Sequence, residues 1–283
     1  MLPDEPGFAE AAFVAHGRAV SRRQERQVCH DCARRPQAPA WRPPIRILIL
    51  QHLDEGHPWY LRGLLAAAGC TTTTVRLDRG EPLPPATAFD ALLVMGGVVQ
   101  VWQEDAYPWL AAEKDFIRGW IEADKAYLGI CLGHQLLAAA CGGAVGLARA
   151  PEIGMLPVEV LAAGRAHAAF RDMTLAERLQ WHMAEVTAPP PDFAVLAQSS
   201  RCAVQALGRG DAVLSVQYHV EADVDTLPAW FALPGATHTL AEVLYEDSPA
   251  AFQQRVLAAM PALNAHARTF FAAWLAAARR RLA

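Results

Sequence analysis

The stretch that decides the fold spans residues 127–140 and reads Tyr-Leu-Gly-Ile-Cys-Leu-Gly-His-Gln-Leu-Leu-Ala-Ala-Ala. Its first four residues predict a short buried strand, and His134–Ala140 predict a helix that follows almost at once. A cysteine at such a junction lies on a strained turn, which projects its side chain above the carboxyl edge of a sheet. Gly129 and Gly133 flank Cys131 at two residues on either side, and a Cβ at either position would collide with its surroundings. The stretch therefore predicts a nucleophile elbow.

Strands and helices alternate on both sides of this elbow from Ile45 onward. The runs Ile45–Leu50 and Ala91–Met95 are continuously apolar, which is typical of strands buried on both faces of a parallel sheet. Between residues 109 and 121 the apolar positions recur at helical spacing. Residues 144–220 contain shorter, more β-rich segments. This alternation predicts a doubly wound, mostly parallel α/β sheet.

The two ends of the chain differ from its centre. Residues 1–43 carry clustered arginine and proline without apolar periodicity, so we expect a poorly ordered extension. We expect one catalytic domain over residues 44–245. Residues 246–283 are rich in alanine, and they predict a helical segment that is interrupted at Pro261 and packs on the domain.

Composition and charge exclude several classes of protein. The 283 residues are 53% apolar with a formal net charge of −4, so a large core is expected and no basic surface for nucleic acid. The longest apolar runs, about ten residues or fewer, are too short to cross a bilayer. No secretory signal opens the chain, and we expect a cytoplasmic protein without membrane contact.

The cysteines do not form a recognisable framework. Six are present, at spacings that match no disulfide scaffold. Cys29 and Cys32 form one CxxC pair, which supplies only half of a tetrahedral zinc site, and no second pair follows. We therefore expect no metal and no cofactor. Apart from Cys131, the cysteines are interpreted as ordinary thiols.

The elbow at Cys131 needs a base and a group that orients the base. The helix that follows Cys131 directs its dipole at the sulfur, which favours the thiolate. His219 lies at the end of the apolar run Ala212–Tyr218, at the same sheet edge as the elbow. Glu221 follows two residues later, so a bend at Val220 brings its carboxylate to the imidazole. We therefore predict that Cys131, His219 and Glu221 are the catalytic residues.

Acyl transfer also requires donors for an oxyanion, and backbone N–H groups serve this purpose. One is the N–H of Leu132, directly after the nucleophile. A second comes from the glycine turn Met95-Gly96-Gly97 at the end of another strand. Leu132 and this glycine turn therefore supply the predicted oxyanion donors.

Three motifs together resemble the class I (triad) glutamine amidotransferases, in particular stand-alone proteins similar to the glutaminase domain of GMP synthase. They are Gly-Ile-Cys-Leu-Gly-His-Gln at 129–135, Met-Gly-Gly at 95–97 and Gln-Tyr-His-Val-Glu at 217–221. The resemblance extends from Ile45 to about residue 245.

The resemblance implies a flavodoxin-like sheet and hydrolysis of glutamine through a γ-glutamyl thioester. Carried over to this sequence, Cys131 attacks, His219 moves protons and Glu221 orients His219. The N–H groups of Gly97 and Leu132 hold the oxyanion in this carry-over. Gly97 also contacts the substrate, which Gln135 helps to place. The order of histidine before acid argues against an α/β-hydrolase.

Two departures from the family pattern leave the substrate open. Val220 stands where family members usually carry proline, so the bend is less rigidly fixed. Met183 stands in a segment, 181–185, where the family often has glycine, and it reshapes the predicted substrate pocket. No ATP-pyrophosphatase domain or P-loop follows Glu221 in this sequence.

Three functions remain open from the sequence. The first is a glutaminase that releases ammonia for a separate synthetase. The second is a stand-alone hydrolase or peptidase for γ-glutamyl compounds. The third is a catalytically silent regulatory or binding module, against which the complete Cys-His-Glu set argues. The ammonia acceptor, the partner and the oligomeric state cannot be deduced from the residues.

Overall fold

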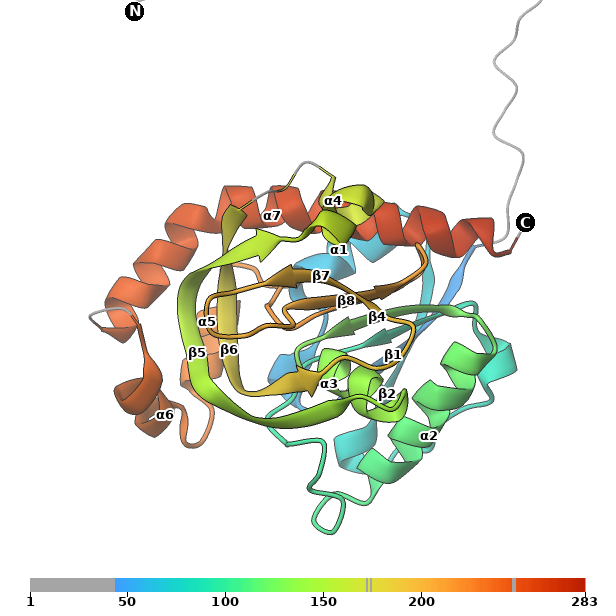
Figure 1. The fold of residues 1–283 in the computed structure, drawn as a ribbon. Coiled ribbons are helices and arrows are strands. Elements are labelled where there is room, and N and C mark those ends of the chain that lie inside the picture. Colours follow the sequence, from blue (N-terminus) through green and yellow to red (C-terminus); the bar gives the residue numbers. More distant parts are fainter. Residues whose placement is uncertain (1–43, 172, 174, 246–247, 283) are drawn as a thin grey trace, which may run out of the picture. The chain divides into compact units, whose positions relative to one another are not determined.

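Nine strands in the described residues form one mixed sheet, in the order β2-β1-β3-β4-β9-β8-β7-β5-β6 (Figure 1). The computed structural model describes residues 44–171, 173, 175–245 and 248–282. The expectations for residues 1–43, including the Cys29–Cys32 pair, lie outside these residues. The strands are β1 (Arg46–Gln51), β2 (Thr71–Arg76), β3 (Ala91–Val94), β4 (Ala126–Ile130), β5 (Ala144–Val160), β6 (Leu175–Ala188), β7 (Ala194–Gln198), β8 (Ala206–Arg209) and β9 (Val213–Val216).

The parallel half of the sheet has the flavodoxin-like order β2-β1-β3-β4-β9, as predicted. Its inner strands β1, β3 and β4 are buried almost throughout, which explains their continuous apolar runs. In the register of this half, Leu50 pairs with Val94, and Ile130 pairs with Val216. The carboxyl ends of β1, β3, β4 and β9 therefore meet at one edge.

The antiparallel half differs in detail from the sequence prediction. Instead of short segments, β5 and β6 form a long hairpin that curves around the end of the sheet (Figure 1). Strand β6 alternates between buried and half-buried residues, but some of its buried positions carry polar side chains such as Gln180 and His182. The apolar alternation that predicts a strand is therefore masked, and β6 and β8 are absent from the prediction.

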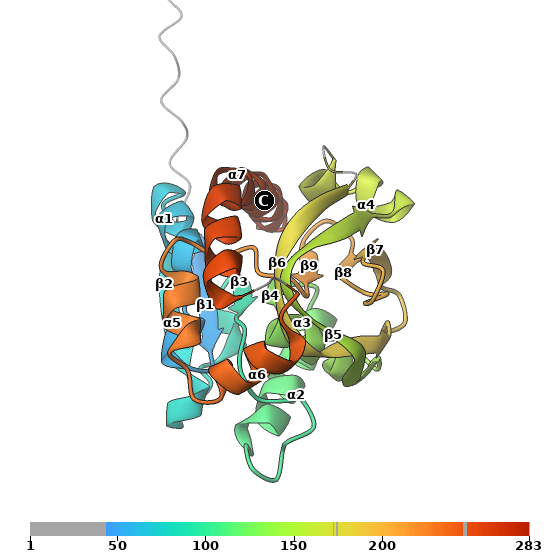
Figure 2. The ribbon, with the colours of Figure 1, turned by 90° about the vertical axis from the view of Figure 1, so that its left-hand side faces the viewer.

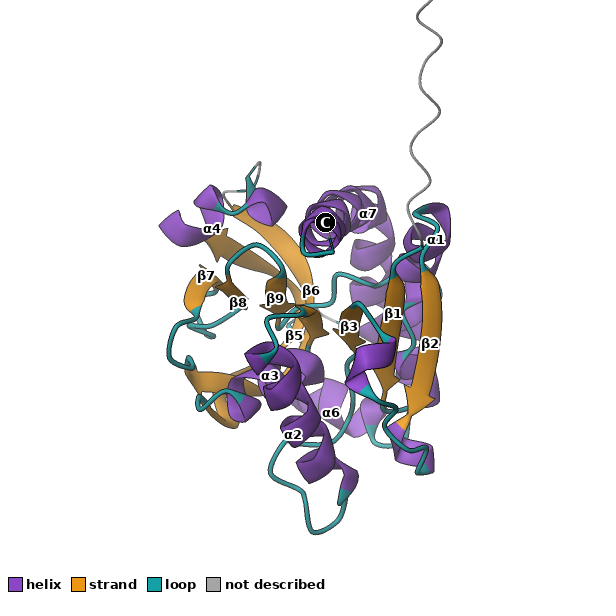
Figure 3. Cartoon of the chain, turned by 90° about the vertical axis from the view of Figure 1, so that its right-hand side faces the viewer, coloured by secondary structure: helices purple, strands orange, loops and turns teal. Residues whose placement is uncertain are grey.

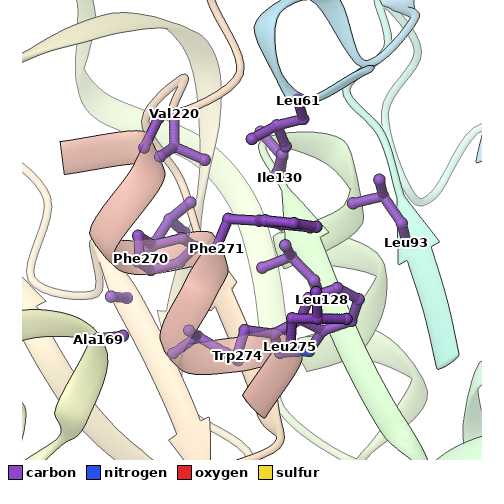
Figure 4. Close-up of a cluster of buried hydrophobic side chains, with 14 of the residues drawn as sticks. Leu61, Leu93, Leu128, Ile130, Ala169, Val220, Phe270, Phe271, Trp274 and Leu275 are labelled. Carbon is purple, nitrogen blue, oxygen red and sulfur yellow. The ribbon is translucent and has the colours of Figure 1, made fainter. Parts of the chain in front are cut away.

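Helices cover both faces of the parallel half (Figures 1 and 3). Helices α1 and α7 pack on one face, and α2 and α3 on the other. Figure 4 shows part of the first layer, where Phe271 and Trp274 of α7 lie against Leu128 and Ile130 of β4. The helices are α1 (Trp59–Ala67), α2 (Trp109–Glu122), α3 (Leu132–Ala140), α4 (Ala162–Ala166), α5 (Thr226–Phe231), α6 (Ala236–Val243) and α7 (Pro249–Arg280).

Helix α7 runs through Pro261, so the predicted interruption there is wrong. Its N-terminus is capped by Ser248, whose hydroxyl accepts a hydrogen bond from Ala251 N–H at 3.1 Å. Proline removes one helical hydrogen bond, and the helix is bent rather than broken (Figure 2). Burial of its apolar side chains, together with a hydrogen bond from Trp274 Nε1 to Tyr127 O at 2.9 Å, outweighs that loss. None of the helices in the described part of the chain combines the length and apolarity of a membrane span.

Candidate active site

Cys131 lies on a strained turn between β4 and α3, with φ 52° and ψ −102°. A non-glycine residue in such a conformation costs on the order of 1–3 kcal/mol, which the surrounding packing must offset. The two flanking glycines are required sterically: a Cβ on Gly129 would lie 2.7 Å from the Gly133 backbone, and one on Gly133 would lie 2.3 Å from Val94 O. The steric reason predicted for these glycines is therefore confirmed.

His219 and Glu221 form a buried pair in the loop after β9. His219 Nδ1 lies 2.7 Å from Glu221 Oε1, and Tyr60 N–H holds the Glu221 carbonyl at 2.9 Å. The bend at Val220 therefore brings the two side chains together without proline. Burial alone would lower the pKa of His219, but the Glu221 carboxylate and the Cys131 sulfur raise it to about 10. The other ring nitrogen, Nε2, makes no hydrogen bond to nitrogen or oxygen within the described residues.

The register between β4 and β9 places Gln217 beside Cys131. Cys131 N–H donates to Val216 O at 2.9 Å, and Gln217 Nε2 lies 3.6 Å from Cys131 Sγ. Gln135, in the first turn of α3, donates through its own Nε2 to Gln217 Oε1 at 3.0 Å and to Ala184 O at 2.9 Å. Gln135 therefore connects the nucleophile to strand β6. Sequence reasoning quoted Gln217 within its motif but assigned no contact to it.

The predicted oxyanion donors lie at the same edge. Gly97 and Cys131 line one cavity, and a Cβ on Gly96 would lie 3.6 Å from both Cys131 Cβ and His219 Cε1. Leu132 is the first residue of α3, so its N–H has no intrahelical acceptor. Gly97 and Leu132 therefore adjoin Cys131, and their role as oxyanion donors stays a prediction.

Two cavities meet at Cys131. The first, about 60 Å³ in volume, contains His219 and has apolar walls that include Trp181 and Trp230. The second, about 250 Å³, is lined by Gln135 and by the β6 segment from Trp181 to Ala184. Met183 lines this second cavity, where the sequence predicts a reshaped pocket. No arginine or lysine of the described residues lines either cavity.

One cluster in the described residues has the composition of a metal site. Glu152, His182 and Cys202 are buried, and their ligand atoms lie within 4.8 Å of one another. Hydrogen bonds already occupy the carboxylate, which accepts from His182 Nε2 at 2.9 Å and from Gln205 Nε2 at 2.7 Å. Burial also raises the pKa of the Cys202 thiol far above its ordinary value, which disfavours the thiolate that a metal requires. We therefore interpret the cluster as a brace between β5 and β6.

Sequence reasoning missed a second buried pair beside the site. His52 follows β1 and lies 3.1 Å from Gly96 O and 3.0 Å from Glu113 Oε1. Glu113 is fully buried on α2 and shares its buried face with Leu110 and Ile117. Two signals were available: a histidine directly after the first core strand, and a carboxylate on the apolar face of a predicted helix.

Comparison with known proteins gives a consistent family. The model of the glutamine amidotransferase class I family matches residues 54–229, more than half of the chain. The glutamine amidotransferase-like protein YfeJ of Salmonella typhimurium is 32% identical over 164 residues, which cover 56% of this chain and 68% of YfeJ. A glutamine-hydrolysing GMP synthase subunit of Pyrococcus abyssi is 36% identical over 102 residues, 35% of this chain and 53% of that protein.

The similarity to solved structures agrees with the sheet order. A glutamine amidotransferase from Methylobacillus flagellatus superimposes with a TM-score of 0.75 at 24% identity, covering 82% of this chain and 94% of that one. A second, from Thermotoga maritima, gives a TM-score of 0.71 at 21% identity, with coverage of 80% and 96%. At these identities the match establishes the fold alone. With the family match over residues 54–229, it follows that the chain belongs to the class I glutamine amidotransferase family.

Proposed function

We propose that this chain hydrolyses the γ-amide of glutamine through a thioester on Cys131 and releases ammonia for a separate synthetase. One observation carries the proposal: Cys131 on its elbow and the buried His219–Glu221 pair line the same cavity. A nucleophile, a proton carrier and a group that orients the carrier are the parts that such a hydrolysis requires.

The reaction takes place in two steps. Cys131 Sγ attacks the amide carbon, and the resulting oxyanion accepts hydrogen bonds from Gly97 N–H and Leu132 N–H. His219 Nε2 gives its proton to the departing nitrogen, the C–N bond breaks and ammonia leaves. Water then attacks the thioester carbon and transfers a proton to His219, and the C–S bond breaks. Glutamate leaves, and Cys131 returns to the thiolate that begins the next cycle. Glu221 keeps His219 in the orientation that both transfers need.

The larger cavity is suited to the amino-acid end of the substrate. Gln135 uses both protons of Nε2 on Ala184 O and Gln217 Oε1, which leaves its own Oε1 available to accept a hydrogen bond from the substrate ammonium. Since no arginine or lysine among the described residues lines the cavity, we assign the substrate carboxylate to other donors. This arrangement favours a small zwitterionic γ-glutamyl compound.

A separate synthetase is proposed as the ammonia acceptor because several relatives are named as subunits of glutamine-hydrolysing GMP synthases. Coverage of those proteins is partial: the chain spans about half the length of the Pyrococcus abyssi protein. The expected sign of such a partner is a glutaminase rate that rises when the synthetase is added. A rate that does not change would remove the partner from the proposal.

A second candidate function is hydrolysis of γ-glutamyl amides of small amines. It is favoured by the smaller cavity, where Trp181, Trp230 and Leu233 provide an apolar wall beside Cys131 and His219. Ammonia has no carbon atoms to bury against an apolar wall. A short alkylamine does, and burying them there would stabilise its complex. Met183, which stands where the family often has glycine, lines the larger cavity and is a second feature in favour of this candidate.

A substrate panel separates these functions. Glutamine, γ-glutamylethylamide and γ-glutamylmethylamide are incubated with the enzyme and with Cys131→Ala, and glutamate is measured. Glutamine as the best substrate supports the main proposal, and preference for the ethylamide supports the second candidate. Failure of all three substrates, with no covalent labelling by a glutamine-analogue diazoketone, would indicate a silent module.

A further inference from the structure

His52 and Glu113 form a buried pair that the hydrolysis scheme does not use. The His52 side chain is 1% exposed and that of Glu113 is 0% exposed. His52 Nε2 lies 3.0 and 3.2 Å from the two carboxylate oxygens, and Nδ1 lies 3.1 Å from Gly96 O. The ring also stacks on Trp109, with a centroid distance of 5.4 Å. The imidazole is therefore fixed at both nitrogens and across its face.

Both partners of His52 are acceptors only. A carboxylate and a carbonyl oxygen have no proton to give, so both hydrogen bonds form only when both ring nitrogens carry protons. Burial opposes that charge, but Glu113, the Gly96 carbonyl and the more distant Asp78 together raise the pKa of His52. With Glu113 ionised, the His52 ring carries a proton on both nitrogens and donates to both partners.

The carbonyl that His52 holds belongs to the Gly96–Gly97 peptide. All described peptide bonds are trans, so the C=O of Gly96 and the N–H of Gly97 point in opposite directions in one plane. A hydrogen bond on the oxygen therefore fixes the direction of the N–H. Donation by a cation also polarises the peptide, which strengthens its N–H as a donor.

The glycines leave room for this contact. A Cβ on Gly97 would lie 3.1 Å from His52 Cβ and 2.6 Å from Leu132 Cδ2, whereas one on Gly96 would lie close to Cys131 and His219. The turn is therefore sandwiched between His52 on one side and the nucleophile on the other. His52 does not line either cavity at Cys131, so it acts on the site only through the peptide.

We propose that the His52–Glu113 pair positions and strengthens the Gly97 N–H as an oxyanion donor. The proposal rests on the function proposed above, because it needs an oxyanion on Cys131. His52 is a positioning residue in this scheme: it does not touch the substrate, and its effect is largest in the transition state. Loss of the pair should therefore lower kcat while KM changes little.

The test compares three variants with the intact enzyme. His52→Leu removes both hydrogen bonds, while His52→Asn keeps a neutral donor near the position of Nδ1. Glu113→Gln keeps a neutral partner and most of the packing. We expect kcat for glutamine to fall on the order of 10²-fold in His52→Leu, the usual effect of losing one oxyanion donor, and less in the other two. KM should stay within about threefold.

Two further measurements separate positioning from general damage. The γ-semialdehyde of glutamate forms a thiohemiacetal whose oxygen occupies the oxyanion hole, so its Ki should rise in parallel with the loss of kcat. Alkylation of Cys131 by iodoacetamide needs no oxyanion hole, and its rate should stay within about twofold. His167→Leu is the matched control, because His167 is buried but contacts Ala169 N–H, away from Cys131, and it should lose stability but keep kcat.

The outcomes are distinct. If the intact enzyme neither hydrolyses glutamine nor binds the aldehyde, the proposed function fails, and this inference fails with it. If the intact enzyme is active and His52→Leu keeps its kcat and aldehyde affinity, this inference alone is wrong. A lower kcat that comes with a raised KM and slower alkylation would also overturn it, because that pattern indicates a collapsed site. Should His52→Leu fail to fold, His52→Asn and Glu113→Gln decide the question by the same criteria.

Discussion

Alanine at Gly133 should destabilise the protein and displace the nucleophile, whereas alanine at two other helical glycines should stabilise it. Gly63 in α1 and Gly119 in α2 are exposed, and a Cβ on either would have no neighbour within 4 Å. Alanine there gains helix propensity, about 0.5–1 kcal/mol. Gly133 in α3 has the same backbone advantage but a Cβ position 2.3 Å from Val94 O and 2.9 Å from Val94 C.

The steric term should outweigh propensity at Gly133. An ordinary contact begins near 3.4 Å, so α3 and β3 must separate by roughly 1 Å to admit the methyl group. Overpacking of this kind costs about 1–3 kcal/mol or more, which lowers Tm by roughly 2–4 °C for each kcal/mol in a domain of this size. Cys131 is two residues away, and a displacement of about 1 Å at a reacting group can cost about 10²-fold in rate.

Thermal unfolding of the three variants and their rates of glutamine hydrolysis provide the assay. The expected pattern is a lower Tm and a much lower kcat for Gly133→Ala, with Tm raised slightly and kcat unchanged for Gly63→Ala and Gly119→Ala. The reasoning is refuted if Gly133→Ala is as stable and as active as the intact protein. Equal destabilisation in all three variants would also contradict it.

Other predictions concern the triad and the response to acid. His219→Asn should lower kcat by several orders of magnitude, and Glu221→Gln by less, because orientation weakens while the base remains; equal rates of ammonia release for all three proteins would contradict this. Burial lowers the pKa of His134 to about 3, and its neutral ring accepts from Ser215 Oγ and donates to Val204 O. In the unfolded chain the pKa of His134 is about 6.5, so below that pH its ring binds a proton there but stays neutral in the folded protein. The free energy of unfolding therefore falls as the pH falls toward 3. Urea unfolding at pH 7 and pH 5 measures the free energy of unfolding of the intact protein and of His134→Gln. Between pH 7 and pH 5 the intact protein should lose about 2 kcal/mol relative to the variant, and an unchanged difference would contradict the assignment.

The parallel half of the fold could be predicted because its inner strands are buried on both faces. Continuous apolar runs such as Ile47–Leu50 and Ala91–Val94 leave a clear signal in sequence. The β5–β6 hairpin could not be predicted at its full length, because buried polar residues such as Gln180 and His182 mask the alternation. The course of α7 through Pro261 depends on tertiary packing, which local propensity does not contain.

The residues of the candidate site also differ in how far the sequence predicts them. Cys131, its flanking glycines and the pair His219–Glu221 are encoded by residues close in sequence, so local spacing is sufficient to predict their geometry. His52 and Glu113 are separated by 61 positions, and their contact depends on how β1 and α2 pack. The local sequence around each of the two residues suggests that it is unusual, but it does not predict that they contact each other.

Covalent labelling of Cys131 tests the central claim most directly. The intact protein is incubated with the diazoketone analogue of glutamine, 6-diazo-5-oxo-norleucine, digested and examined by peptide mass spectrometry, with glutamine as competitor and Cys131→Ala as control. The account predicts one adduct, on the peptide that contains Cys131, slowed by glutamine and absent from the variant. An adduct on Cys70, Cys141 or Cys202, or labelling of Cys131→Ala at the rate of the intact protein, would contradict it.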